Sequence, residues 1–195
     1  MRVIGLTGSI GMGKSTTAAM FARRGIPVHD SDATVHRLYT GEAVASIEAA
    51  FPGVTASGGV DRAGLAERVV SDPAALARLE AIVHPLVRRS EEAFLAKAQA
   101  DGRRLALADV PLLFETDAAG RFDVIVVVTA DVEIQRARVL ARTGMSEAKS
   151  ASLLARQVPD EEKRRRAHFL VDSGRGFAAA EREVDAILRA LAASA

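Results

Sequence analysis

The residues best suited to chemistry lie close together near the beginning of the sequence. The stretch Gly8-Ser9-Ile10-Gly11-Met12-Gly13-Lys14-Ser15 fits the pattern G-x-x-x-x-G-K-[ST]. Glycines let the backbone curl so that successive N–H groups point at one phosphate. Lys14 is expected to reach the β- and γ-phosphates of a nucleotide, and the Ser15 hydroxyl to bind Mg²⁺. The residues predicted to bind ATP are Gly8, Gly11, Met12, Gly13, Lys14, Ser15 and Thr16.

The segments on either side of this loop are those that a phosphate site requires. Residues 3–7 form an apolar, β-branched run that predicts a buried strand. The residues after Lys14 follow a helical pattern with Met20 and Phe21 on one side. A helix that begins at the loop adds unpaired N–H groups and a positive dipole end to the same anion.

Three carboxylates follow predicted strands. Asp30 and Asp32 come after a short strand at 26–29, the edge at which open α/β sheets place their ligands. One of the two can cap the next helix while the other does chemistry, and the residues alone do not decide between them. Asp109 ends the apolar run 105–108, which is typical of a Walker B strand. We therefore expect Ser15 and Asp109 to hold Mg²⁺.

Arginines are concentrated after the predicted strand at 122–128. A helical hairpin studded with arginines at that place is typical of a lid, because the guanidinium fork meets phosphate oxygens in pairs. Most of these side chains are expected to form a solvated surface. Arg142 is the first candidate for a phosphate-clamping arginine, and Arg138 is the second.

Residues 33–100 follow a helical pattern throughout, which is more than a plain crossover between strands needs. They are predicted to form an inserted module that binds the second substrate. Pro85 is expected to end one helix or to start the next. His84 before it either contacts that substrate or serves as a capping or packing residue.

Five strands that alternate with helices predict an α/β fold with a parallel sheet, as in the P-loop NTPases. The chain is predicted to be a single domain, 1–195. The predicted parts are a core at 1–32, 101–134 and 167–195, the insert at 33–100, and a lid at 135–166. No feature predicts an oligomeric state.

Composition excludes several classes of protein. The net charge of +1 gives no bulk electrostatic case for nucleic acid, and no apolar run is long enough for a membrane span. The absence of cysteine excludes disulfides and thiolate catalysis, and it fits a cytoplasmic protein. We expect neither a nucleic-acid nor a membrane partner.

Among nucleotide-binding classes, a switch GTPase needs an Asn-Lys-x-Asp segment, whereas this sequence has no asparagine. A small core with an acceptor module and an arginine-rich lid favours a small-molecule kinase. The alternatives are a P-loop kinase that acts on a nucleoside or nucleotide, and a nucleotide-dependent binding switch.

The sequence also resembles the dephospho-CoA kinase family along its whole length. The resemblance rests on IGLTGSIGMGKST, VHDSDATVHRL, GVDRAGLAERVVSD, RLEAIVHPLV, DVPLLFE and the segment 157–163. It implies phosphorylation of the ribose 3′-hydroxyl of dephospho-CoA by ATP. It also implies Asp32 as the base, the insert as a CoA-binding module, and Arg142 in the lid over ATP. Two departures are Ala167-His168, where the family commonly has Ala-Asp, and Ser173-Gly174, where it commonly has Asn-Gly.

Overall fold

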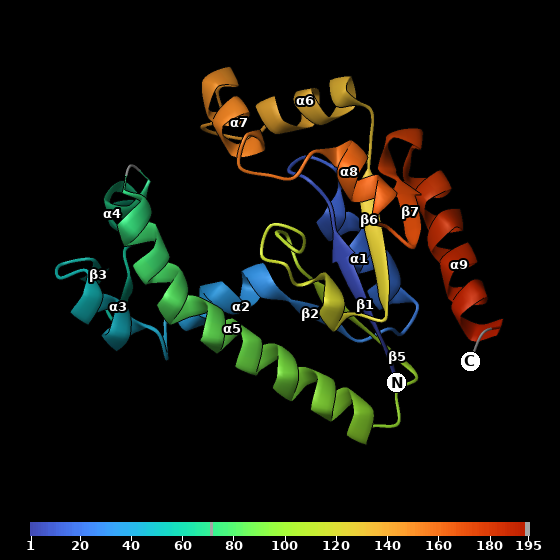
Figure 1. The fold of residues 1–195 in the computed structure, drawn as a ribbon, viewed down its shortest axis with the longest axis horizontal. Helices are drawn as coiled ribbons and strands as arrows, with labels where there is room; N and C mark the ends of the chain where they lie inside the picture. The colour runs from blue at the N-terminus through green and yellow to red at the C-terminus, as the bar shows by residue number, and fades with distance from the viewer. Residues whose placement is uncertain (71, 194–195) are drawn as a thin grey trace. The chain divides into compact units, whose positions relative to one another are not determined.

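A sheet with the strand order β2-β5-β1-β6-β7 organises the protein, whose computed structural model describes residues 1–70 and 72–193 (Figure 1). The strands are Arg2–Thr7 (β1), Val28–Asp30 (β2), Leu105–Asp109 (β5), Val124–Thr129 (β6) and Phe169–Asp172 (β7). β1 pairs in parallel with β5 and β6, so that Leu6 lies opposite both Asp109 and Val126. β6 pairs in parallel with β7. The predicted five-stranded parallel sheet is confirmed.

The chain divides into two units, Met1–His29 with Ala98–Ala195, and Asp30–Lys97. Of the predicted insert, residue 71 lies outside the described residues, as do 194 and 195 of the predicted core. Within the described residues, no helix is both long enough and apolar enough to cross a membrane. Beyond its strands, the first unit contains α1 (Lys14–Arg23), η1 (Ala119–Arg121), α6 (Val132–Leu140), α7 (Glu147–Leu154), α8 (Asp160–Arg165), η2 (Ser173–Arg175) and α9 (Phe177–Ala193).

Both faces of the sheet are covered, as the continuous apolar run of β6 indicates. Every residue of β6 is buried. Val126 packs in the cluster that contains Phe21 of α1 and Val184 of α9. Val127 packs in a second cluster, with Phe114 from the segment after β5. Neighbouring residues of β6 thus contribute to different cores, as the twofold period of a strand requires.

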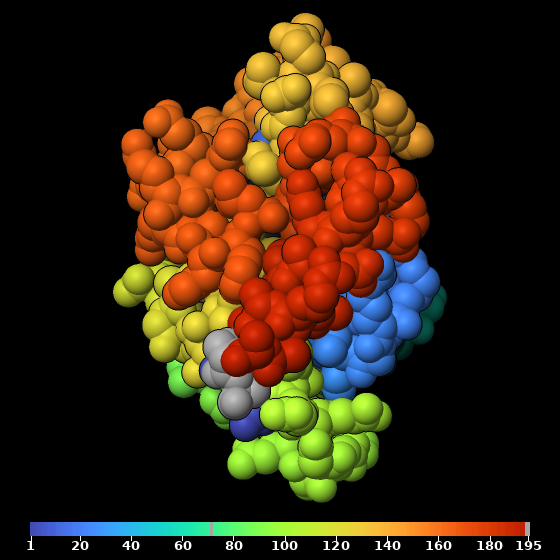
Figure 2. Space-filling model, turned by 90° about the vertical axis from the view of Figure 1, so that its right-hand side faces the viewer, coloured from blue at the N-terminus to red at the C-terminus, as the bar shows by residue number. Residues whose placement is uncertain are grey.

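Helices α1 and α9 are joined by ion pairs. Arg24, just after α1, donates to both carboxylate oxygens of Asp185, and Arg23 Nη2 lies 3.2 Å from Glu181 Oε1. The hydrogen bond from Arg24 holds the pKa of Asp185 below its usual value. Figure 2 shows the red surface of α9 adjoining the blue chain around the end of α1.

The second unit has an apolar core of its own. Its elements are α2 (Ser31–Leu38), α3 (Val44–Ala50), β3 (Thr55–Ala56), β4 (Gly59–Val60), α4 (Arg62–Val69) and α5 (Pro73–Ala100), the last of which continues into the first unit. Ile47, Phe51, Leu65 and Leu79 are among the residues buried together in that core.

The prediction of helix throughout residues 33–100 is wrong at one place. β3 and β4 form an antiparallel hairpin in which Thr55 lies opposite Val60. Ser57 and Gly58 between them both have positive φ angles, 52° and 82°. Two such residues make the turn that matches the twist of paired strands, so Ser57 and Gly58 close a hairpin.

Pro85 neither ends nor starts a helix, because α5 runs unbroken from Pro73 to Ala100 with Pro85 inside it. Proline removes one helical hydrogen bond and is unfavourable there. The apolar face continues across it: Leu79 and Val83 are buried in the core of the second unit, and Leu86 packs against the same core. Burial of that face on both sides of Pro85 outweighs the local penalty.

Candidate functional site

The glycine-rich loop between β1 and α1 adopts a backbone that side chains would not permit. Gly11 and Gly13 have φ angles of 82° and 87°, and Gly13 occupies the N-cap position of α1. A Cβ atom at Gly8 would lie 2.6 Å from the carbonyl oxygen of Val128. The glycines of the motif are therefore needed both for the turn and for its close packing against β6.

Lys14 and Asp109 meet at this loop. Lys14 Nζ lies 2.5 Å from Asp109 Oδ1, and the two side chains are 13% and 3% exposed. β5 places the carboxylate here because its pairing with β1 sets Asp109 opposite Leu6, just before the loop. The expected Walker B carboxylate thus lies within reach of the phosphate-loop lysine.

The donors available for Mg²⁺ are hard oxygen atoms. Ser15 follows Lys14 directly and is exposed, whereas Asp109 is buried beside Lys14. The described residues contain no cluster of three or more His, Cys, Asp or Glu that could hold a metal ion by itself. A hydroxyl and one carboxylate suit Mg²⁺, which takes its remaining ligands from phosphate and water. Ser15 and Asp109 therefore fit a magnesium ion that arrives with a nucleotide.

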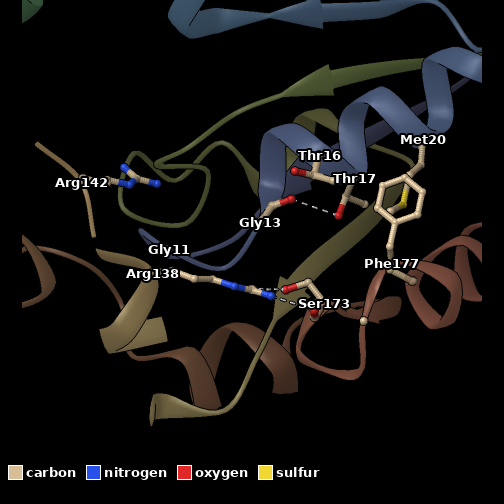
Figure 3. A pocket seen from close by; sticks show the side chains of 11 residues that line it. Gly11, Gly13, Thr16, Thr17, Met20, Arg138, Arg142, Ser173 and Phe177 are labelled. Atoms are coloured by element: carbon tan, nitrogen blue, oxygen red, sulfur yellow. Dashed lines mark hydrogen bonds between the residues drawn. The ribbon is translucent and has the colours of Figure 1, made fainter. Parts of the chain in front are cut away.

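A pocket of about 330 Å³ opens beside the loop, entirely within the first unit (Figure 3). Its lining comes from the loop, α1, α6 and its C-terminal end, and the segment from η2 into α9. The lining residues are Gly11, Gly13, Thr16, Thr17, Met20, Arg138, Arg142, Ser173, Gly176, Phe177 and Ala180. The structure thus brings both candidate arginines to the same cavity as the phosphate loop.

The two arginines are held differently. Arg138 donates from Nη1 to Ser173 Oγ at 2.7 Å and from Nη2 to the Ser173 carbonyl at 2.9 Å (Figure 3). Arg142 follows α6 and is exposed, and its side chain makes no hydrogen bond or ion pair with another described residue. Arg142 is therefore the side chain that remains available for an anion.

In the segment after β7, sequence reasoning singled out Ser173-Gly174 only as a departure from the family pattern and did not name Phe177. Ser173 and Phe177 line the pocket, and Phe177 is 54% exposed although it is a large apolar side chain. Arg23 lies over its ring, 5.4 Å from the centroid. The available signal was positional, since ligands bind beyond the carboxyl ends of parallel strands and β7 ends at Asp172.

His168, the other departure from the family pattern, has a structural role. Its backbone N–H donates to the Ile125 carbonyl at 2.9 Å, and its ring Nδ1 accepts the Ile125 N–H at 3.0 Å. The side chain thereby satisfies a backbone donor of β6 just before β7 begins. His168 is absent from the pocket lining.

Asp30 and Asp32 differ in their local partners. Asp30 is the N-cap of α2, and its Oδ1 accepts the Ala33 N–H at 2.9 Å. Asp32 lies in the first turn of α2 and is exposed. Both belong to the second unit, whereas Lys14, Ser15 and Asp109 belong to the first. Because Asp30 is used as a cap, Asp32 remains the candidate base.

His84 lies inside α5 and is exposed. A capping residue stands at a helix end, and a packing residue is buried, so neither of these roles fits its position. Contact with a substrate remains as the expectation for His84.

The predicted lid, 135–166, contains most of α6 together with α7 and α8. Ser146 caps α7 by accepting the Lys149 N–H at 3.2 Å, and that helix ends at Leu154. Asp131 occupies the N-cap position of α6 without a capping hydrogen bond from its side chain.

A buried ion pair joins the last helix of this segment to the loop after β5. Lys163 of α8 is 0% exposed, and its Nζ lies 2.8 Å from Glu115 Oε1. The Lys163 ammonium forms this ion pair and no hydrogen bond with the described residues. Glu115 Oε1 also accepts the Val158 N–H at 2.9 Å. The pair thus fixes the end of the DVPLLFE segment against the end of the lid segment.

We expect Glu115→Gln to lower the free energy of unfolding by about 3 kcal/mol, because it leaves the Lys163 ammonium buried without its partner. Urea unfolding followed by circular dichroism measures this loss. Glu161→Gln is the matched control, since it breaks an exposed pair with Arg165 and is expected to cost less than about 1 kcal/mol. Equal losses in the two variants would contradict the expectation that the buried Glu115–Lys163 pair stabilises the protein more than the exposed pair does.

Comparisons of the sequence with a family model and with curated proteins point to the same family. The family model described as "Dephospho-CoA kinase" matches residues 2–178. A dephospho-CoA kinase of Mesorhizobium japonicum is 62% identical over 188 residues, which are 96% of this chain and 95% of that protein. One from Agrobacterium fabrum is 61% identical over 193 residues, or 99% of this chain and 100% of that protein.

Solved structures show the same fold. The structure of TT1252 from Thermus thermophilus has a TM-score of 0.86 at 37% identity, and covers 97% of each chain. A dephospho-CoA kinase from Campylobacter jejuni has a TM-score of 0.68 at 20% identity, again over 97% of each chain, and supports the fold alone. A shikimate kinase from Acinetobacter baumannii has a TM-score of 0.52 at 21% identity, covers 100% of this chain and 94% of its own, and likewise supports only the fold.

Proposed function

This chain belongs to the dephospho-CoA kinase family, and we propose that it transfers the γ-phosphoryl group of ATP to the ribose 3′-hydroxyl of dephospho-CoA. The products are ADP and coenzyme A, in the last step of coenzyme A biosynthesis. The supporting observation from the fold is the phosphate loop itself, with the Lys14–Asp109 pair on it and a pocket beside it that contains Arg138 and Arg142.

On the nucleotide side, the first unit supplies groups that bind and orient ATP. The N–H groups of the loop and the Lys14 ammonium bind the phosphates, and Arg142 adds a charge from the lid. Ser15 and Asp109 would hold Mg²⁺, which neutralises charge on the phosphates when it is bound. Closure of the segment 135–166 excludes water, which would otherwise consume the γ-phosphoryl group.

On the acceptor side, the second unit supplies the base. Asp32 accepts the proton of the ribose 3′-hydroxyl as that oxygen attacks phosphorus, while Asp30 caps α2 and fixes the first turn in which Asp32 lies. The insert 33–100 has its own apolar core, so it can present a stable surface to the large body of dephospho-CoA. Binding energy from that remote body helps to orient the reacting hydroxyl.

We propose that the reaction takes place in the cytoplasm, a location with which the absence of cysteine is consistent. The proposed partner is the small molecule dephospho-CoA. The proposal includes no nucleic acid or membrane.

We expect dephospho-CoA to be the preferred acceptor in a panel that also contains AMP, CMP, dTMP, adenosine and no acceptor. ADP release with ATP and Mg²⁺ is followed for each, and the position of the new phosphate is established by mass spectrometry and NMR. The expected result is a kcat/KM for dephospho-CoA at least about 100-fold above that of any mononucleotide, because only this acceptor uses the whole insert.

Two results would overturn this assignment. A mononucleotide with the higher kcat/KM would make the chain a nucleotide kinase. ADP release that is indifferent to every acceptor would instead indicate a hydrolase or a nucleotide-dependent switch.

A further inference from the structure

Side chains from three other segments of the first unit form hydrogen bonds with the backbone of the phosphate loop. Gln135 of α6 donates from Nε2 to the carbonyl of Ile10 at 2.8 Å. Ser173, at the start of η2, donates from Oγ to the carbonyl of Met12 at 2.7 Å. Gln157, between α7 and α8, accepts the N–H of Ile10 with its Oε1 at 3.1 Å.

These contacts fix the orientation of two peptide planes. The described chain has no cis peptide bond, and in a trans peptide the C=O and the following N–H point in opposite directions. A carbonyl of Ile10 that points at Gln135 therefore turns the Gly11 N–H away from α6. In the same way, the carbonyl of Met12 that points at Ser173 turns the Gly13 N–H away from η2.

The two N–H groups so directed have no partner within the part of the chain that the structure describes. Neither the Gly11 nor the Gly13 N–H has a hydrogen-bond acceptor among residues 1–70 and 72–193. The side toward α6 and η2 is tightly filled, since a Cβ atom at Gly11 would lie 2.6 Å from Val139 Cγ2 and one at Gly13 would lie 3.1 Å from Ser173 Oγ. The two donors are consequently turned away from the side chains of α6 and η2 that pack against the loop.

We propose that Gln135 and Ser173 are positioning residues that aim the Gly11 and Gly13 N–H groups at the nucleotide phosphates. Gln157 complements them by occupying the Ile10 N–H, which removes that donor from phosphate binding. Gly11 and Gly13 have the backbone freedom to rotate these planes, so the loop needs external hydrogen bonds to stay in one arrangement. This inference rests on the proposed binding of ATP and extends it to residues outside the motif.

Ser173 also forms hydrogen bonds with Arg138, which lies in the predicted lid segment. Its hydroxyl donates to Met12 and accepts from Arg138 Nη1, so one side chain connects the loop, η2 and α6. In Ser173→Ala, Arg138 retains its hydrogen bond to the Ser173 backbone carbonyl, and the loss is centred on the Met12 contact. Gln135→Met keeps the length of a side chain that is only 7% exposed and removes its donor.

The test is equilibrium binding of ADP, inorganic tripolyphosphate and adenosine to the full chain and its variants. We expect Gln135→Met and Ser173→Ala each to raise the Kd of ADP and of tripolyphosphate about 5- to 10-fold. This is less than the loss of a whole hydrogen bond to a charged group, because the N–H donor remains and only its orientation is loosened. The Kd of adenosine should change less than about twofold, because adenosine has no phosphate.

Ile187→Val in the core of α9 is the control for general loss of stability. It should lower Tm and leave all three Kd values unchanged. The inference is overturned if either variant binds ADP and tripolyphosphate within about twofold of the unchanged chain, or if adenosine binding weakens as much as ADP binding. Because the two substitutions lie on different elements, a folding failure of one leaves the other to decide. Failure to phosphorylate dephospho-CoA would overturn the proposed function alone, since these measurements need no acceptor.

Discussion

Replacing Lys14 with alanine is expected to lower the rate of phosphoryl transfer by about 10³-fold or more. Lys14 supplies the ammonium of the phosphate loop, and its side chain lies almost wholly inside the protein, against Asp109. No other lysine belongs to the loop, so its charge at the γ-phosphoryl group cannot be replaced locally. Initial rates with saturating dephospho-CoA and ATP measure the effect.

This substitution also removes an ion-pair partner of the buried Asp109 carboxylate, so Tm is expected to fall by a few degrees. The assay therefore includes circular dichroism at the same temperature, which should show an unchanged secondary structure. Arg189→Ala removes an exposed cation from α9 and should retain the normal rate. Turnover of Lys14→Ala close to that of the unchanged chain would mean that Lys14 does not act at the phosphates.

The second large effect is expected for Asp32→Asn, which should lower kcat by about 10²- to 10⁴-fold, the weight of a positioned general base. Asparagine keeps the shape of the side chain but cannot accept the hydroxyl proton. ATP binding should change little, because the proposed role of Asp32 concerns only the acceptor. The measurement is kcat with dephospho-CoA, together with the Kd of a non-hydrolysable ATP analogue.

Asp30→Asn is the matched control, since an asparagine oxygen can still accept the Ala33 N–H and cap α2. It should retain most of the activity. A large loss in Asp30→Asn with little loss in Asp32→Asn would reverse the assignment. A shift of the Mg²⁺ dependence in both variants would instead identify the two carboxylates as metal ligands.

The parts of the fold that the sequence predicted correctly are those specified by local patterns. The apolar run that ends at Asp109 is a strand, Leu105–Asp109, as predicted, because short apolar runs between turns favour buried strands. The second strand begins at Val28 rather than at Ile26. Pro27 before it has no N–H to donate, although its carbonyl accepts the Leu107 N–H.

The parts that sequence reasoning missed depend on distant contacts. Pro85 is a helix breaker by local rules, and only the core of the second unit shows why α5 continues through it. Gln135 belongs to no motif, and Ser173 stood out only as a departure from the family pattern. The role proposed for both follows from packing that brings them to the carbonyls of Ile10 and Met12. A site that depends on hydrogen bonds from side chains to the backbone is difficult to recognise in a sequence, because many residue types can donate one hydrogen bond.

The sheet order has a consequence for the making of the protein. β1 pairs with β5 and β6, both of which follow it by about half the chain. At a synthesis rate of about 5–20 residues per second, β1 and the loop wait on the order of 5–20 s on the ribosome before either partner strand exists. The residues of the second unit, by contrast, find their apolar core within one continuous segment. Its core is therefore complete first, and the nascent chain is unable to hold ATP until the strand that ends in Asp109 has emerged and paired.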